Sequence, residues 1–483
     1  MATSLLRSQD DGEPADMQAC LAAQKTAFDA EGYPSKALRI DRLRRAHDLL
    51  GQFEAQICDA LMEDYGYRSK EQSFFVEVMT TAKPFRDAIK NVGRWMKPEK
   101  RSAGFPFNMA GASAEVRYQP LGVVGCISPW NFPVNLTFMP LAGILAAGNR
   151  AMVKPSEFTP NTAELMREMF ASAFTPEEIA VFTGGPDVAA AFSALPFDHL
   201  LYTGGENVAK HIMRAAAENL VPVTLELGGK SPVILGKGAN LKLAADRILF
   251  GKIFNAGQVC LSPDYLFVQK NEIDSVAAAL VSAAENAVPK ERGPQDLVSI
   301  VNARHAERLR GYTAQAKDAG TRVIELDWTG GQSDAQANMV PITLLIDPDD
   351  DQLVMREEVF GPLLPIKTYD TLGDVSAFIR SRPAPLALYY FGSDQDEIEH
   401  LLGNTRSGGV TVNDVIMHYT IDDLPFGGVG ASGMGAYHGF DGFKQFSHAR
   451  AIYRQSKLDV AGALRPPYGP TFQKMSRFLF KHG

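Results

Sequence analysis

The alternation of strand-like and helix-like segments between residues 122 and 226 is the feature that most constrains the fold of this chain. Short runs rich in β-branched and other apolar residues lie near 122–127, 150–153, 179–182, 199–202 and 222–226. Stretches of helical character separate them, near 136–147, 160–173, 186–194 and 206–219. Neighbouring parallel strands require such crossovers, so we expect a doubly wound α/β unit. Ligands of such units bind at the carboxyl ends of the strands.

A second set of strand-like and helix-like segments follows from about 230 to 412. The chain has 483 residues, more than one hydrophobic core usually organises, so we expect several domains. Its formal net charge of −8 argues against bulk electrostatic binding to nucleic acid or to an anionic membrane. Residues 118–149 carry no charge, but prolines interrupt them, so we expect a buried strand, a loop and a buried helix rather than a membrane span.

The cysteines indicate the compartment and the absence of a metal site. Cys20, Cys58, Cys126 and Cys260 form no Cys-x-x-Cys pair and no cluster with the spacing of zinc ligands. So few cysteines in a long chain favour a reducing environment. The first residues contain no apolar core of signal-peptide length. We therefore expect a cytoplasmic protein without a metal.

Two charged clusters are expected to lie on the surface. The basic one falls within a helical stretch and contains Arg39, Arg42, Arg44 and Arg45. We interpret it as a solvated helix face rather than a nucleic-acid patch. The acidic one contains Asp347, Asp349, Asp350 and Asp351 beside a proline, which is typical of a surface loop rather than of a metal site.

Cys260 is the candidate nucleophile. It ends the segment Phe-Asn-Ala-Gly-Gln-Val-Cys, where Gly257 and Gln258 allow a sharp backbone turn that presents the thiol. A thiolate attacks carbonyl carbon readily. Taken alone, a buried structural cysteine is the simpler interpretation.

Glu226 and Asn131 are candidates for acid–base and electrostatic roles. Glu226 ends a strand in an apolar run before two glycines, where burial would raise its pKa toward neutrality and suit a general base. A structural carboxylate bonded to backbone amides is the alternative. Asn131 lies between two prolines in Pro-Trp-Asn-Phe-Pro and could be a rigid amide donor to an oxyanion. A turn-forming asparagine is its alternative.

Three segments have features of a nucleotide site. Lys154 and Glu157 follow a strand and could hydrogen-bond ribose hydroxyls, while Gly204 and Gly205 follow another strand and precede a helix, as in phosphate-binding turns. Each could equally be an ordinary strand-to-helix turn. The segment 428–433 matches G-x-G-x-x-G, but no convincing strand precedes it. We interpret it as a glycine-rich loop near the substrate or a subunit contact.

Together these motifs resemble the aldehyde dehydrogenase superfamily over nearly the whole chain. The matches occur in order and comprise Asn131 in PWNFP, Lys154 and Glu157 in KPSE, Glu226 in LELGGK, Cys260 in GQVC, and Glu358 and Phe360 in EEVFGP. CLSPDY, NDVIMH and PFGGVGASGMGAYHG are similar to the class 3 branch, which handles aromatic and fatty aldehydes. DYGYRSKE (64–71) and RWMKP (94–98) resemble bacterial coniferyl-aldehyde dehydrogenases.

The resemblance implies an α/β fold with two doubly wound domains and a small β-hairpin for oligomerisation. The expected coenzyme domain covers 1–103 and 121–226, the catalytic domain covers 227–440, and the bridging element covers 104–120 and 441–460. The implied partners are a small-molecule aldehyde and a second copy of the chain in a homodimer, with no nucleic acid and no membrane.

The resemblance also implies the chemistry. Cys260 attacks the aldehyde, Asn131 and the Cys260 backbone N–H hold the oxyanion, and Glu226 activates water against the thioester. The implied cofactor is NAD, with NADP possible, and its site contains Trp130, Lys154, Glu157, Gly204, Gly205, Glu358 and Phe360. We expect a hydrophobic aromatic aldehyde like coniferaldehyde, because Trp130, Phe254, Tyr265 and Phe426 flank the matched motifs. The alternative substrates are medium- or long-chain aliphatic aldehydes.

The sequence departs from the family pattern at two positions. Ala209 stands where the family commonly has glycine, and Glu206 where it has a small or hydroxyl residue. A carboxylate at position 206 would repel a pyrophosphate unless it points to solvent. Two other functions stay open, an acyl-CoA- or acyl-phosphate-linked relative and a catalytically silent binding protein. The presence of Asn131, Glu226 and Cys260 together argues against both.

Overall fold

A computed structural model describes residues 14–289, 296–326 and 338–482. Its first sheet has the order β15-β7-β6-β3-β4-β5, and its strands are parallel except for β15. The strands are β3 (Val123–Ile127), β4 (Arg150–Lys154), β5 (Ile179–Val181), β6 (His199–Thr203), β7 (Val223–Glu226) and β15 (Gly433–Met434). The intervening helices are α6 (Asn135–Ala147), α7 (Pro160–Ala173), α8 (Pro186–Ser193) and α9 (Glu206–Ala217). The alternation predicted from the sequence is thus confirmed.

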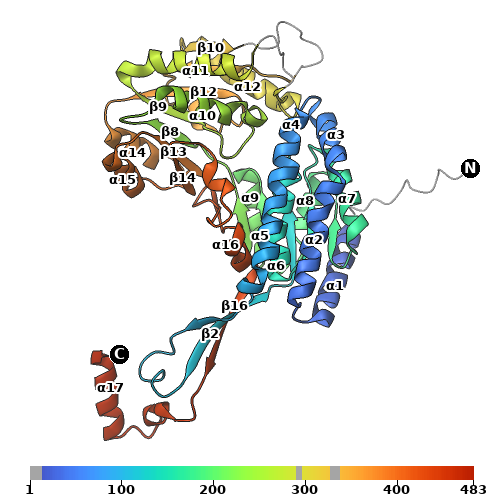
Figure 1. The fold of residues 1–483 in the computed structure, drawn as a ribbon, viewed down its shortest axis with the longest axis vertical. Coiled ribbons are helices and arrows are strands. Elements are labelled where there is room, and N and C mark those ends of the chain that lie inside the picture. Colours follow the sequence, from blue (N-terminus) through green and yellow to red (C-terminus); the bar gives the residue numbers. More distant parts are fainter. Residues whose placement is uncertain (1–13, 290–295, 327–337, 483) are drawn as a thin grey trace, which may run out of the picture.

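The uncharged segment forms a buried strand, a loop and a buried helix, as predicted. Every residue of β3 and α6 is buried, because α6 packs between the sheet and other helices. Two of the helices that pack on α6 are α2 (Lys36–Gln52) and α5 (Thr80–Trp95). Figure 1 shows them in blue beside the first sheet, together with α1 (Pro14–Glu31) and α3 (Glu54–Tyr65). Within the described ranges, no helix combines the length and the apolar character needed to cross a membrane.

The prediction of a solvated basic face on α2 was wrong for two of its arginines. Arg39 is fully buried and donates to the carbonyl oxygens of Ala146 and Ala147 at 2.8 and 2.6 Å, at the C-terminal end of α6. Arg42 is also buried and pairs with two carboxylates, Glu31 and Glu178. A buried guanidinium needs such partners, and they come from segments that the helix's own sequence does not reveal. The acidic residues at 347–351 form an exposed turn, as predicted.

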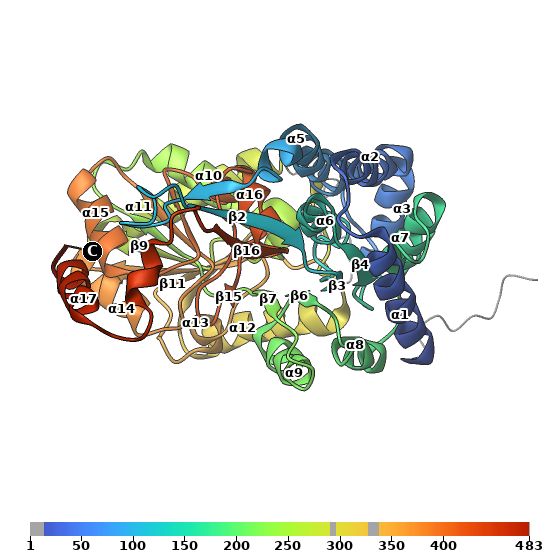
Figure 2. The same ribbon diagram turned by 90° about the horizontal axis from the view of Figure 1, so that it is seen from below.

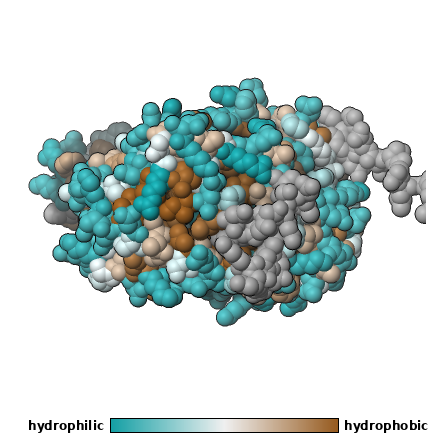
Figure 3. Space-filling model, turned by 90° about the horizontal axis from the view of Figure 1, so that it is seen from above, coloured by the Kyte–Doolittle hydropathy of each residue, from teal (hydrophilic) through white to brown (hydrophobic). Residues whose placement is uncertain are grey.

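The second sheet has the order β10-β11-β12-β9-β8-β13-β14, with only β10 antiparallel to its neighbour. Its strands are β8 (Pro232–Leu235), β9 (Tyr265–Gln269), β10 (Arg322–Leu326), β11 (Ile342–Ile346), β12 (Leu363–Tyr369), β13 (Ala387–Phe391) and β14 (Gly409–Val412). The helices around it include α10 (Leu241–Ile253), α11 (Ile273–Ala287), α12 (Ala303–Asp318), α14 (Leu372–Arg380) and α15 (Gln395–Asn404). Seen from above, this end of the molecule is mostly hydrophilic, with hydrophobic residues gathered near its middle (Figure 3).

A third, small sheet extends away from the two larger ones. It consists of β1 (Glu99–Arg101), β2 (Ser113–Pro120) and β16 (Ser447–Arg454), all antiparallel, with β2 in the middle. Figures 1 and 2 show β2 and β16 running side by side, and in Figure 1 helix α17 (Pro470–His482) lies at their far end. The pairing of β2 with residues near 447–456 is as expected. The expected start of the hairpin at residue 104 was wrong.

Residues 105–111 form turns, so strand β2 begins only at Ser113. Gly104 and Gly111 adopt left-handed backbone angles, with φ of 77° and 91°. Pro106 between them has no N–H to donate to a strand ladder. The short strand β1, which pairs with β2, precedes this turn and escaped the sequence prediction.

Candidate active site

Two cavities meet at the carboxyl edge of the first sheet. A cleft of about 1050 Å³ contains the residues that follow β6 and β7 and reaches Glu358 and Phe360 on the other side. A second cavity of about 470 Å³ is lined mostly by apolar side chains. Both are bordered by Cys260 and Glu226. The two candidate reactive groups therefore stand where a ligand in one cavity would contact a ligand in the other.

The backbone before Cys260 is held in an uncommon conformation. Helix α10 ends at Ile253, and Asn255, Ala256 and Gly257 then have φ of 49°, 52° and 70°. Left-handed angles at two consecutive non-glycine residues cost free energy, so the surroundings must enforce them. At Gly257 a Cβ would lie 2.3 Å from the carbonyl oxygen of Gly361, which excludes any side chain.

Gln258 holds this turn in place. Its side chain is fully buried, donates to the carbonyl oxygens of Asn255 and Ser299 at 3.0 and 3.1 Å, and accepts from the amide of Val301 at 3.0 Å. The turn that presents Cys260 is thus fixed from the inside of the second domain. This confirms the expected sharp turn at Gly257 and Gln258.

The Cys260 thiol lies beside two carboxyl groups, those of Glu226 and Glu358. It is partly buried, and burial raises the pKa of the thiol well above its ordinary value of 9.0. The carboxyl groups of Glu358 and Glu226 raise this pKa further. The thiol is consequently protonated at neutral pH in this geometry, and its activation requires a proton acceptor.

Glu226 can be such an acceptor. It ends β7, between β6 and β15, and only 3% of the residue is exposed. Neither carboxylate oxygen has a hydrogen-bond partner among the described residues. Burial therefore raises the pKa of Glu226 well above its ordinary value of 4.5. The alternative of a structural carboxylate bonded to backbone amides does not apply.

Asn131 lies in the loop between β3 and α6 and is buried at the cleft wall. Its amide nitrogen donates to the carbonyl oxygen of Gln258 at 3.0 Å. An amide carries two hydrogens, so one remains for a second acceptor. The loop with Asn131 and the turn with Cys260 are thus directly bonded to each other.

The glycine turn after β6 also lies in the cleft. Gly205 precedes α9 without a side-chain cap, and the space where its Cβ would lie is open. The first N–H groups of α9 are therefore free of any capping side chain and accessible to an anion. Glu206 pairs with Lys210 at 2.6 Å along the helix, which balances the carboxylate at that position. Ala209 is buried against the sheet.

Lys154 and Glu157 form an ion pair of 3.2 Å at the end of β4, beside rather than within the cleft lining. Burial lowers the pKa of Lys154, and Glu157 opposes this change. Burial raises the pKa of the Tyr202 hydroxyl, and the nearby Glu157 carboxylate adds a smaller rise. That hydroxyl donates to the carbonyl oxygen of Gly205 at 3.3 Å. This pair is therefore a neighbour of the glycine turn.

Glu358, Phe360 and Trp130 form the other end of the cleft. The Glu358 carboxyl lies over Gly228, where a Cβ would be 2.2 Å from its oxygen. Burial, with a smaller effect of Asp264, raises the pKa of Glu358 to about 8. The Phe360 ring is edge-on to Trp130 at 5.3 Å.

The apolar cavity has aromatic walls. Phe132, Phe254 and Phe250 form a continuous stack with centroid distances of 5.6 and 5.5 Å. Phe426 also lines this cavity, so two of the four aromatic residues expected there are confirmed. The other two, Trp130 and Tyr265, line the larger cleft instead. A flat ring fits between flat walls better than a chain of equal volume does.

The glycine-rich segment 428–433 lies against the strand that carries Glu226. The Leu227 amide donates to the Ser432 carbonyl at 3.1 Å, and Gly433 pairs with Glu226 across β15 and β7. A Cβ at Gly433 would lie 2.1 Å from the carbonyl oxygen of Leu225. The glycine there permits close strand contact, which agrees with a loop near the substrate site and not with a phosphate-binding turn.

Comparisons with known proteins agree with this geometry. The model of the "Aldehyde dehydrogenase family" matches residues 3–452. The chain belongs to the aldehyde dehydrogenase family. It is 50% identical to a probable coniferyl aldehyde dehydrogenase of Caulobacter vibrioides over 468 residues, 96% of each chain. It is 48% identical to a coniferyl aldehyde dehydrogenase of a Pseudomonas species, covering 93% of each.

Relatives of class 3 and solved structures extend the comparison. A family 3 member B2 aldehyde dehydrogenase from Mus musculus is 36% identical, covering 95% of this chain and 94% of that one. The substrate-bound Staphylococcus aureus AldH structure has a TM-score of 0.90 at 36% identity, covering 96% and 99%. The NAD⁺ complex of a Bacillus cereus aldehyde dehydrogenase has a TM-score of 0.81 at 26% identity, covering 92% and 90%. The predicted family, class and fold are thus confirmed.

This aldehyde dehydrogenase uses NAD(P), and its cleft fits that cofactor. The uncapped first turn of α9 suits a pyrophosphate, while the carboxyl of Glu358 suits a ribose diol. Two cleft residues of this aldehyde dehydrogenase escaped the sequence analysis. The His305 ring lies 5.3 Å from that of Trp130, tilted by 42°, and Arg308 donates to the carbonyl oxygens of Glu358 and Val359 at 3.3 and 2.8 Å. Both lie in α12, where no motif marks them.

Proposed function

We propose that this aldehyde dehydrogenase oxidises a conjugated aromatic aldehyde of the coniferaldehyde type to its acid. The observation that carries the proposal is the stacked aromatic wall of the 470 Å³ cavity beside Cys260. The relatives named as coniferyl aldehyde dehydrogenases, at 48% and 50% identity, support it. Burying one aromatic ring there would contribute on the order of 1–3 kcal/mol.

The proposed chemistry assigns one step to each reactive group. The Cys260 sulfur bonds to the aldehyde carbon, and its proton passes to the carboxylate of Glu226, because burial raises the pKa of Glu226 and makes it a stronger proton acceptor than an exposed carboxylate. The free N–H of Asn131 and the Cys260 backbone N–H bind the oxyanion. NAD, when bound in the cleft, would supply the hydride acceptor, and loss of hydride from the aldehyde carbon would leave a thioester on Cys260.

Glu226 has a second task in this scheme. After it has released the thiol proton to solvent, Glu226 removes a proton from the water that attacks the thioester carbon. The C–S bond then breaks, and the proton passes from Glu226 to the leaving Cys260 sulfur as the carboxylic acid forms. Trp130, Gly204, Gly205, Glu358 and Phe360 would hold the cofactor within the cleft, and Lys154 and Glu157 would bind its ribose beside the glycine turn. At neutral pH a Glu358 carboxyl with a pKa of about 8 both donates and accepts hydrogen bonds, as a ribose diol requires.

The three sheets support the proposed domain organisation, apart from the two short strands β1 and β15, which pair across the proposed boundaries. Residues 1–103 and 121–226 form the coenzyme domain, of which the first 13 lie outside the described residues, and 227–440 form the catalytic domain. Residues 104–120 and 441–460 form the bridge to a second copy in a cytoplasmic homodimer. Strand β16 supports this, because it is the edge of its sheet, with exposed side chains and no partner on its outer side among the described strands.

Steady-state kinetics on an aldehyde panel tests the substrate proposal. We expect kcat/KM to fall in the order coniferaldehyde, benzaldehyde, hexanal, acetaldehyde, with about a 5- to 150-fold span between the aromatic and two-carbon substrates. Hexanal as the best substrate would support the aliphatic alternative. Acetaldehyde equal to coniferaldehyde would refute an aromatic site, and no NAD reduction with any aldehyde would support a silent homologue.

A further inference from the structure

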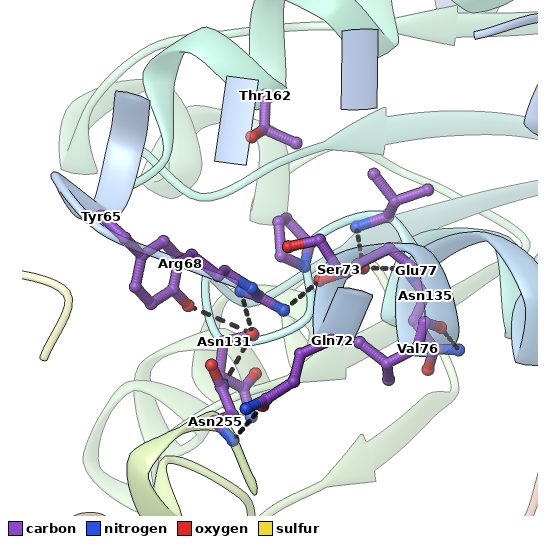
Figure 4. A network of polar contacts seen from close by, with 12 residues as sticks. Tyr65, Arg68, Gln72, Ser73, Val76, Glu77, Asn131, Asn135, Thr162 and Asn255 are labelled. Atoms are coloured by element: carbon purple, nitrogen blue, oxygen red, sulfur yellow. Dashed lines mark hydrogen bonds and ion pairs between the residues drawn. The ribbon is translucent and has the colours of Figure 1, made fainter. Parts of the chain in front are cut away.

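The segment 64–71 lies against the loop that carries Asn131 (Figure 4). The Tyr65 hydroxyl donates to the carbonyl oxygens of Trp130 and Asn131 at 3.0 and 3.1 Å. The Arg68 guanidinium donates to the same Asn131 oxygen at 2.9 Å. Both side chains are almost completely buried, Tyr65 at 2% and Arg68 at 1% exposure. Residues 64–71 thus contact the backbone of Asn131, the proposed oxyanion donor.

Glu77 extends this contact to the start of α6. Arg68 donates a second hydrogen bond, 2.7 Å long, to one Glu77 oxygen, and Glu77 is fully buried. The other oxygen accepts the amide hydrogens of Val134 and Asn135 at 3.1 and 2.8 Å. The Arg68–Glu77 pair therefore holds the loop 129–135 at two points, before and after its second proline (Figure 4).

A third donor connects the loop to the nucleophile. The side-chain amide of Asn255 donates to the Asn131 oxygen and to the Gln258 oxygen, at 3.1 Å each. A carbonyl oxygen has two lone pairs, yet that of Asn131 receives donors from Tyr65, Arg68 and Asn255. Three directions of restraint fix the Asn131 peptide plane, and with it the direction of the side-chain amide.

We infer that Arg68, supported by Tyr65 and Glu77, is a positioning residue that aims the Asn131 amide at the reacting carbonyl oxygen. The inference rests on the proposed role of Asn131 in aldehyde oxidation. A hydrogen-bond donor stabilises an oxyanion only at the correct distance, and small displacements lower rates strongly. Arg68 itself borders neither of the two cavities. Its guanidinium binds the Asn131 backbone and Glu77 and lies 5.5 Å from the centre of the Phe132 ring, so it can affect the reaction only through these neighbours.

A double-mutant cycle separates positioning from general stabilisation. We expect Asn131→Ala to lower kcat about 100- to 1000-fold. Arg68→Lys, which replaces a two-pronged donor by a single ammonium, should lower kcat about 10- to 100-fold by itself. In the Asn131→Ala background the same Arg68→Lys change should alter kcat less than about twofold, while the KM for NAD stays near the wild-type value. Equal falls in both backgrounds would overturn the inference.

Two further variants keep the result unambiguous. Tyr65→Phe removes one of the three donors with little change of shape, and it completes the same cycle if Arg68→Lys does not fold. Arg39→Lys is the matched control, since Arg39 is equally buried and binds carbonyl oxygens at the opposite end of α6. It should lower the melting temperature and leave kcat within about twofold.

The kcat values of these variants test the positioning role of Arg68 separately from the oxyanion role of Asn131. Wild-type kcat for Asn131→Ala would refute the proposed oxyanion role itself. A strong loss for Asn131→Ala with no loss for both Arg68→Lys and Tyr65→Phe would leave that role standing and refute the positioning. A kcat loss in Arg39→Lys as large as in Arg68→Lys would also refute it, because any buried arginine would then matter equally.

Discussion

Replacing Glu226 by glutamine should stop the enzyme after the first half of its reaction. Glutamine has nearly the same size, so the packing between β6 and β15 stays as it is. It cannot accept a proton, and the described structure offers no hydrogen-bonded relay to either oxygen of this side chain. Addition of the aldehyde to Cys260 and loss of hydride can still occur once, with the thiol proton lost slowly to solvent. The thioester then persists.

The magnitude follows from the isolation of this carboxyl group. A positioned general base contributes about 100- to 10,000-fold to a proton-transfer step, which corresponds to about 3–5 kcal/mol of activation free energy. Glu226 is 3% exposed and has no hydrogen-bonded partner within the described chain that could pass a proton in its place. The other carboxyl group near Cys260, that of Glu358, lies over Gly228 at the proposed cofactor end of the cleft. We therefore expect the steady-state rate of Glu226→Gln to fall by at least 100-fold.

Intact-protein mass spectrometry is the decisive assay. After the addition of NAD and coniferaldehyde, Glu226→Gln should gain the mass of one acyl group. Cys260→Ser should gain none and should show no NAD reduction, although it still binds NAD, because a serine hydroxyl is hardly ionised at neutral pH. Wild-type turnover of Glu226→Gln without an adduct would refute the assignment of the base. A loss of only a few fold in Cys260→Ser would refute the thioester.

The pH dependence gives the same side chain a second signature. Burial raises the pKa of Glu226 in the folded protein, so the folded chain holds a proton that the unfolded chain releases. Its contribution to the free energy of unfolding is thus present below pH 4.5, the ordinary value, and is lost as the pH rises through the folded pKa. Over that range, wild-type stability should fall relative to Glu226→Gln while wild-type deacylation rises. Parallel stability curves for the two proteins would contradict this.

Two further predictions concern the cofactor and the assembly. NAD should give a higher kcat/KM than NADP, because the Glu157 carboxylate accepts hydrogen bonds from a ribose diol and repels a 2′-phosphate. Glu157→Gln should reduce the ratio of the two kcat/KM values. A preference for NADP in the wild type would refute this prediction. Sedimentation equilibrium should give twice the chain mass of 52.6 kDa, because the outer edge of β16 is available for a second copy, and a single-chain mass would refute the homodimer.

The sequence predicted the elements that depend on local pattern. The crossovers of the first sheet match their predicted ranges within two residues, since each strand is short, apolar and followed by a helix of ordinary period. Cys260, Glu226 and Asn131 were candidates from the sequence, because each stands at a marked break between a regular element and a turn, and the structure places all three in the lining of one cleft. Such features can be predicted from the sequence because they depend on neighbouring residues in the chain.

Features made by distant segments could not be read in this way. Arg39 and Arg42 are buried because carbonyl groups and carboxylates bind their guanidinium groups. Apart from Pro34 and Glu31, these partners lie more than 100 positions away in the sequence. Trp130 lines the larger cleft and Phe254 the apolar cavity, and this difference likewise depends on which cavity each loop faces. Periodicity carries no information on that choice.

The turn at Asn255 joins both kinds of information in one place. Its sequence, with asparagine and glycine at two of the three left-handed positions, permits the conformation without enforcing it. The enforcement comes from Gln258 and from the Asn131 loop, which shares the Asn255 side chain with the turn. The strain that presents the Cys260 thiol is therefore balanced by bonds that also fix the oxyanion donor. The thiol of Cys260 and the side-chain amide of Asn131, the proposed nucleophile and the proposed oxyanion donor, are held by one hydrogen-bond network, so a change that relaxes the turn should misplace both together.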